Sequence, residues 1–196
     1  MEHTEFTAFA AYFEVLCKNK GIEIHSGIKE TPARVCESMD FLLRGYSFSE
    51  RHIKELIKTF DDDCPEGYDE IIFVKNIDFY SICEHHLLPF FGKIHVAYLP
   101  NKKLIGKSKL ERLVEVYSRR LQMQERLVSQ IAYAIMNFPN PKPLAAACII
   151  ASSRHLCTCA RGVENENSEM GTSSMQGKFR EHSIKMELLQ LLNMRR

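Results

Sequence analysis

Apolar residues recur along the chain at two different spacings, and each change of spacing marks the border of an expected element. Between residues 4 and 19 they lie three and four apart, which predicts an amphipathic helix that ends at Gly21. A second helix is expected to begin with Thr31 as its N-cap and Pro32 in its first turn, and to end near Gly45. The pattern therefore indicates an N-terminal unit made of two helices.

Residues 46–68 are polar and include three consecutive aspartates, Asp61 to Asp63, so a solvated loop with a short helix at 50–59 is expected. After this loop, four segments have the alternation or the β-branched and aromatic composition of strands. They are residues 70–83, 92–100, 142–153 and 171–179. The first two are expected to pair as antiparallel neighbours across the segment between them.

Helical spacing returns at Ser108, slips at residues 121–124 and resumes at Leu127, which predicts two helices rather than one rod. Because helices and strands do not alternate strictly, the pattern indicates an α+β fold. We expect a helical region with a connecting loop at residues 1–68, and one compact unit at residues 69–196.

The composition narrows the function classes. The 196 residues are 45% hydrophobic and 26% charged, with a formal net charge of +1, so no overall field points to nucleic acid or a membrane and any anion site must be local. No apolar run approaches the roughly 20 residues of a membrane span, and the N-terminus does not resemble a signal peptide. A cytoplasmic protein is expected, in which the seven cysteines are thiols or metal ligands rather than disulfides.

Two clusters contain residue types that bind metals. The segment ICEHHLLPF places Cys83 and His86 three apart, which is half of a zinc site. The segment RHLCTCARGV contains His155, Cys157 and Cys159. They alternate at strand spacing and are expected to point the same way. Cys83, His86 and one cysteine of the second cluster would make a three-ligand site with an open position for water. Cys83 and His86 with both cysteines would instead make a closed, structural four-ligand site.

Two further imidazoles favour the open, hydrolytic alternative. A structural site has no use for His85 and His155, whereas a hydrolytic site needs groups that exchange protons near neutral pH. Glu84, between the cluster residues, has two equally good interpretations: it orients a neighbouring imidazole, or it forms an ordinary salt bridge.

Cations gather at the start of the helix that begins near Ser108. Lys107, Lys109 and Arg112 lie there, where backbone N–H groups also favour anions, and Arg161 follows the cysteine cluster. A phosphate-binding patch near the metal would explain them, and a solvated charged helix is the alternative.

At the expected helix break, Gln124 and Glu125 combine an amide with a carboxylate. This pair suits recognition of a guanine edge, which offers donors and an acceptor. From the pattern alone, an exposed polar turn is the favoured interpretation.

Long motifs connect these features to a known family. From about Thr31 to Phe179 the chain contains, in this order, ETPARV, CEHHLLPFFGKIHVAYLP, IGKSKLERLVEVYSRRLQMQERL, HLCTCARGV and TSSMQGKF. In residues, order and spacing this resembles the GTP cyclohydrolase I family. The resemblance implies hydrolytic opening of the imidazole ring of GTP at C8, release of formate, and rearrangement to 7,8-dihydroneopterin triphosphate, the first step of folate or tetrahydrobiopterin synthesis.

The resemblance also implies a role for each candidate residue. One Zn²⁺ per subunit would be held by Cys83, His86 and Cys157, with Cys159 at a position that is not a ligand. The catalytic and substrate-binding residues would be His85 and His155 for protons, Gln124 and Glu125 for guanine, Lys109, Arg112 and Arg161 for the triphosphate, Ser108 near the ribose and phosphates, and Arg34 in a neighbouring subunit's site.

The family's fold is the tunnelling fold, an antiparallel four-stranded sheet with two long helices on one face, here with the N-terminal helical unit added. The resemblance implies that five subunits join their sheets into a barrel and that two rings stack into a homodecamer with sites at subunit interfaces. GTP and further copies of the chain are then the expected partners, with no nucleic acid and no membrane.

The chain departs from the family pattern at Lys107, Thr158, Met170 and Gln176, none of which removes an expected ligand. Two alternatives stay open, the first of them motivated by Lys107 and Met170. One is a divergent paralogue that acts on another purine or stops at the formamidopyrimidine intermediate. The other is a non-catalytic, zinc-containing protein that binds a pterin or a nucleotide.

Overall fold

The computed structural model describes residues 3–57, 59–60 and 64–194, so the expected loop at Asp61 to Asp63 lies outside the described residues. The chain divides into two compact units, Met1–Leu43 and Arg44–Arg196. This border lies earlier than the one expected at residue 68. The reason is that helix α4 (Glu50–Leu56) packs on helix α5 (Lys107–Ser118), with Ile53 and Ile57 inside the core of the second unit.

The first unit is helical, as the apolar spacing predicted. Its helices are α1 (His3–Lys20), α2 (Ser26–Lys29) and α3 (Thr31–Leu42), of which α2 was not predicted. Gly21 ends α1 with a φ of +65°, a conformation that costs little without a Cβ. The N-cap of α3 is Glu30 rather than Thr31, and Pro32 lies in the first turn.

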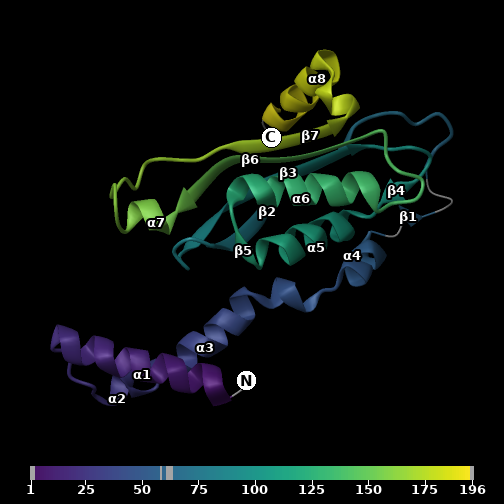
Figure 1. Ribbon diagram of the computed structural model, residues 1–196. Helices are drawn as coiled ribbons and strands as arrows, with labels where there is room; N and C mark the ends of the chain where they lie inside the picture. Colours follow the sequence, from purple (N-terminus) through teal and green to yellow (C-terminus); the bar gives the residue numbers. More distant parts are fainter. Residues whose placement is uncertain (1–2, 58, 61–63, 195–196) are drawn as a thin grey trace. The chain divides into compact units, whose positions relative to one another are not determined.

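The second unit is built on a five-stranded mixed sheet (Figure 1). Its order is β5 (Leu121–Gln122), β2 (Ile72–Cys83), β3 (Pro89–Leu99), β6 (Ala145–His155) and β7 (Thr172–Gly177). Four antiparallel strands were predicted, and the sheet has a fifth, β5. The chain between the two long helices is extended there and pairs in parallel with the end of β2, which makes the sheet mixed. The antiparallel pairing of β2 with β3 is as expected, although β3 begins at Pro89 rather than Gly92. Proline fits there because the first residue of a strand needs no ladder donor.

Each face of the sheet has its own hydrophobic core. Helices α5 and α6 (Gln124–Asn137) cover one face, where they pack on Ile94 and Val96 of β3. On the other face, Ala97 and Leu99 contact the cluster around Phe179 and helix α8 (His182–Asn193). The alternation of these strand residues between the two cores follows from the two-residue period of a strand.

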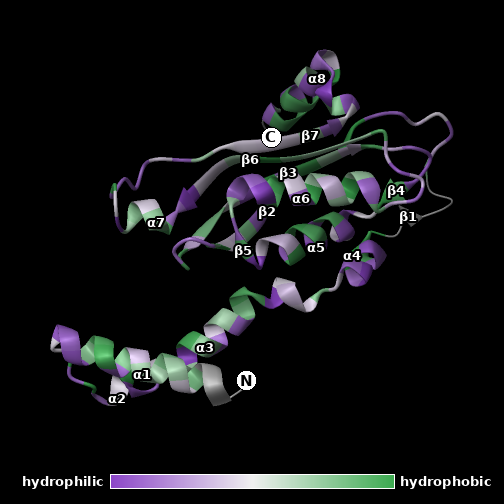
Figure 2. Cartoon of the chain, viewed as in Figure 1, coloured by the Kyte–Doolittle hydropathy of each residue, from purple (hydrophilic) through white to green (hydrophobic). Residues whose placement is uncertain are grey.

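The remaining elements are short. Strands β1 (Thr59–Phe60) and β4 (Leu104–Ile105) pair apart from the main sheet, α7 (Leu156–Cys159) is a single turn, and 3-10 helices span Arg44–Ser47 and Lys178–Arg180. Strand β6 is hydrophobic along most of its length and becomes hydrophilic at its end (Figure 2). No helix in the described part of the chain has the length and apolar content needed to cross a membrane.

Candidate metal centre and its surroundings

Two candidate ligands lie in the tight turn that joins β2 to β3. Cys83 ends β2, and its N–H donates to the carbonyl of Leu88 at 2.9 Å, while its carbonyl accepts from the N–H groups of His86 and Leu87 at 3.3 and 2.9 Å. Leu87 has a φ of +53°, which lets the chain reverse within a few residues. The turn therefore brings Cys83 Sγ within 3.5 Å of His86 Nδ1.

The third candidate, Cys157, lies in α7 directly after β6. The prediction that His155, Cys157 and Cys159 alternate along a strand was wrong. Strand pairing ends where His155 meets Phe90, and Leu156–Cys159 then form a helical turn closed by the Ala160 N–H on the carbonyl of Leu156. Residues two apart on a helix do not share a face, so Cys157 and Cys159 are separated.

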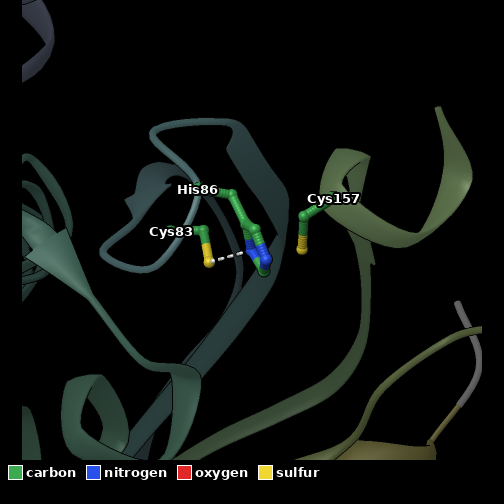
Figure 3. A group of neighbouring side chains, drawn as sticks. All are labelled: Cys83, His86 and Cys157. Atoms are coloured by element: carbon green, nitrogen blue, oxygen red, sulfur yellow. Dashed lines mark hydrogen bonds between the residues drawn. The ribbon is translucent and has the colours of Figure 1, made fainter. Parts of the chain in front are cut away.

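The potential ligand atoms of Cys83, His86 and Cys157 all lie within 4.8 Å of one another. Figure 3 shows the first two projecting from the turn and Cys157 projecting from α7 toward them. A tetrahedral zinc ion would separate a thiolate sulfur from an imidazole nitrogen by about 3.6 Å, close to the 3.5 Å found. Two thiols and one imidazole thus fit a divalent metal of this kind. In the part of the chain that the structure describes, Cys159 is not in the group, so the four-ligand alternative lacks its last donor.

The two candidate thiols differ in their surroundings. Cys83 is 7% exposed. Burial, together with the neighbouring Cys83, raises the pKa of the Cys157 thiol, and the charge of Arg161 opposes this rise. A metal cation would reverse the balance because it binds the thiolate form.

His155 is the last residue of β6 and precedes the candidate ligand Cys157 by two residues. Its ring stacks on that of Phe90, with centroids 4.5 Å apart and planes 6° from parallel. Burial lowers the pKa of His155, and the charge of Glu125 opposes this shift. Sequence reasoning missed the role of Phe90, which follows only from the strand register that places it opposite His155.

Gln124 begins α6 and is 1% exposed, so the alternative of an exposed polar turn was wrong, while its expected contact with guanine stays a prediction. Its Nε2 donates to the carbonyl of Met170 and to Thr172 Oγ1, each at 3.1 Å. Its Oε1 lies 2.9 Å from His155 Nε2 and also accepts from Ser153 Oγ. The amide is therefore fully hydrogen-bonded within the chain, whereas Glu125 beside it is exposed.

Residues 9–193 match the family model of GTP cyclohydrolase I. The chain belongs to the GTP cyclohydrolase I family. It is 45% identical over 186 residues to GTP cyclohydrolase 1 of Alkalilimnicola ehrlichii, which covers 93% of this chain and 95% of that protein. It is 46% identical over 168 residues to the Chlorobaculum tepidum protein of that name, covering 85% and 71%. The same name belongs to a Saccharomyces cerevisiae relative, 44% identical over 171 residues, covering 86% and 67%. The expected family and the expected kind of enzyme, a hydrolase, are thereby confirmed.

His85 is an exposed imidazole beside the candidate metal group. Its Nδ1 lies 3.9 Å from Cys83 Sγ, and its Nε2 lies 3.8 Å from Glu84 Oε1. Glu84 also forms an ion pair with Arg126, which in turn donates from Nε to Gln122 Oε1 at 3.1 Å. The salt-bridge interpretation of Glu84 is thus confirmed, whereas the 3.8 Å to His85 is too long for a hydrogen bond and the orienting role stays a prediction.

The candidate phosphate-binding cations lie at two separate places within the chain. Arg161 is close enough to Cys157 for its charge to lower the pKa of that thiol. Lys109 lies elsewhere: its neighbours Lys107 and Leu110 line a cavity with residues 72–75 at the start of β2. The nine residue-to-residue steps from Val74 to Cys83 span roughly 30 Å of strand. Ser108, Lys109 and Arg112 therefore lie far from the metal group within one chain, and their expected contact with the phosphates stays a prediction.

Two other cations of the family pattern have local partners. Lys107 Nζ lies 2.8 Å from Glu111 Oε1, which accounts for this departure as a surface ion pair on α5. Arg34 belongs to the first unit, where its Nη2 lies 2.7 Å from Glu30 Oε2.

Proposed function

We propose that this chain converts GTP and water to 7,8-dihydroneopterin triphosphate and formate, with one Zn²⁺ per subunit held by Cys83, His86 and Cys157. The observation that carries the proposal is the set of three convergent donors, with His85 Nδ1 3.9 Å from Cys83 Sγ and His155 two residues before Cys157 in the chain. A three-ligand zinc site leaves a position for water, as hydrolysis requires. Zinc, when bound, acts as a Lewis acid that brings the pKa of water toward neutrality and makes water a nucleophile for C8 of the purine.

The side chains of the chain itself hold the substrate and move its protons. His155 and His85 accept and return protons as the imidazole ring opens, which is the role of a general base and a general acid. The exposed carboxylate of Glu125 accepts hydrogen bonds from the N–H groups of guanine, and so fixes the distance between C8 and the metal. Arg161 binds a phosphate oxygen, and binding energy far from C8 holds the reacting ring in place.

The remaining substrate contacts come from other copies of the chain. Ser108, Lys109 and Arg112 belong to the opposite end of β2 from Cys83, which supports a site completed by a neighbouring subunit. Assembly as in the tunnelling fold, with sheets joined into a five-subunit barrel and two rings in a decamer, would place such ends together. Arg34 would enter a neighbour's site in the same assembly.

The test is to incubate purified, metal-analysed protein with GTP and identify the products. Formate and a pterin that fluoresces after oxidation are expected in equal amounts, in proportion to bound zinc. An accumulated formamidopyrimidine would instead identify a paralogue that stops early. Tight GTP binding without turnover, in protein with a full complement of zinc, would identify a non-catalytic binding protein.

A further inference from the structure

The orientation of the Gln124 amide is fixed by a backbone carbonyl. The carbonyl oxygen of Met170 lies 3.1 Å from one end of the amide, and a carbonyl oxygen can only accept a hydrogen bond. The NH₂ group must therefore be at this end, where it also donates to Thr172 Oγ1. The amide oxygen, Oε1, is then directed to the other end, toward Ser153 and His155.

This orientation determines where His155 carries its proton. Oε1 of Gln124 has only lone pairs to offer, so His155 Nε2, 2.9 Å away, must be the donor. A neutral imidazole has a single N–H, and its other nitrogen, Nδ1, then keeps a free lone pair. Within residues 64–194, which the structure describes without a gap, no group forms a hydrogen bond with Nδ1. A flip of the imidazole ring would exchange the positions of Nδ1 and Nε2. Stacking on the fully buried Phe90 opposes this flip.

We propose that Gln124 is the positioning residue of His155: it holds the imidazole as the Nε2–H tautomer and leaves Nδ1 as the atom that accepts the substrate proton. In this role Gln124 does not touch guanine, which is left to Glu125. The side chain at position 170 is not used, since Met170 contributes only its backbone carbonyl. The proposal rests on the proposed function for the proton transfer, but the tautomer exists without substrate.

The first measurement uses the wild-type, zinc-loaded protein with ¹⁵N-labelled histidine in solid-state NMR. The His155 signals are identified by subtracting the spectrum of His155→Ala. A protonated Nε2 and an unprotonated Nδ1 are expected above pH 7, and the opposite pattern would overturn the proposal whatever the protein does with GTP. This result does not depend on turnover, so failure of the proposed function and failure of the tautomer assignment are distinguishable.

The second measurement separates positioning from substrate contact. Gln124→Met keeps the length of the side chain but removes both hydrogen-bonding ends. We expect kcat to fall between about 10- and 100-fold, with KM for GTP within about twofold and the preference for GTP over ITP unchanged. The matched variant Glu125→Gln, which alters a guanine contact, should raise KM and reduce the preference for GTP, because ITP lacks the 2-amino group.

Gln124→Glu is a second variant that keeps the length of the side chain and an oxygen that accepts from Nε2, but loses the N–H groups that donate to Met170 and Thr172. It should retain the Nε2–H signal that Gln124→Met loses. A Gln124→Met protein with wild-type kcat, raised KM and weakened preference for GTP would show that Gln124 contacts guanine and would overturn the proposal.

Discussion

Lys109 and His155 offer a direct test of whether one chain can complete its own active site. Lys109 belongs to the end of the sheet where β2 starts, and His155 to the end where β2 stops, roughly 30 Å away along the strand. A nucleoside triphosphate bound with its purine at Cys83 cannot reach both ends. A chain with Lys109→Ala and Arg112→Ala, and a second chain with His155→Ala, should therefore complement each other in a mixed oligomer.

The size of the rescue follows from counting subunits. If the two chains assemble at random in equal amounts, a site has an intact His155 in half of the cases and, independently, an intact cation pair from its neighbour in half. About one quarter of the sites are then complete. Removing a charge-assisted phosphate contact costs about 1.5–3 kcal/mol, or roughly 10- to 100-fold in kcat/KM. The oligomer of the Lys109 and Arg112 variant alone should therefore have less activity per site than the mixed oligomer, and so should the His155→Ala oligomer, which lacks a proton-transfer group.

The assay co-expresses the two chains with different affinity tags, purifies on both tags in succession, and measures pterin fluorescence per site after oxidation. The matched control pairs His155→Ala with Glu125→Ala, two residues of the same cluster, where every site keeps one defect and no rescue is expected. If the Lys109 and Arg112 mixture were no more active than this control, the two ends of β2 would not belong to one composite site.

Three further predictions concern single residues. Cys157→Ser should lose bound zinc while Cys159→Ser keeps it, as measured by elemental analysis of dialysed protein, because only Cys157 belongs to the group with Cys83 and His86. Burial and the charge of Lys75 lower the pKa of His95, whose Nδ1 accepts the Asn76 N–H at 2.9 Å. Just below the ordinary histidine pKa near 6.5 the unfolded state therefore binds more protons than the folded state, and the free energy of unfolding should decrease as the pH is lowered through this range. Urea unfolding at pH 7.5 and 5.5 should show this loss in the wild type and a smaller one in His95→Asn, whose Oδ1 keeps the acceptor but does not titrate. Gly45→Ala should lower the free energy of unfolding by about 1–3 kcal/mol, since a Cβ would lie 2.3 Å from the Val116 carbonyl oxygen and 2.5 Å from that of Arg119; an unchanged urea midpoint would contradict this.

The elements that could be predicted from the sequence are those whose signal is local. The apolar spacing of α1, α5 and α6 and the alternation in β2 and β3 are visible within a dozen residues, and these elements formed close to the expected positions. Strand β5 could not be found in this way, because two residues become a strand only when the end of β2 lies beside them. Helix α8 was missed although Ile184, Leu188 and Leu192 have helical spacing, since no prediction was made for the segment after residue 179.

The candidate site was predicted in its residue types more fully than in its geometry. The spacing of Cys83 and His86 indicated a metal because both are ligand types within one turn of the chain. Alternation misled at Cys157 and Cys159, where one turn of helix replaces the strand. The burial of Gln124 had no local signal at all, because its partners Met170 and Thr172 are 46 and 48 residues away.

The order of the strands explains why the site is divided in this way. In an antiparallel run of β2, β3 and β6, the end of β2, the start of β3 and the end of β6 lie at one end of the sheet, and β5 delivers the start of α6 to the same end. This single arrangement brings together Cys83, His86, Phe90, Gln124 and His155. Helix α5, however, follows β4 from the opposite end, so its first turn cannot approach the metal group without unpairing the sheet. If the proposed function is correct, Lys109 and Arg112 of one chain can therefore serve only the purine bound by another chain, and the proposed chemistry requires assembly.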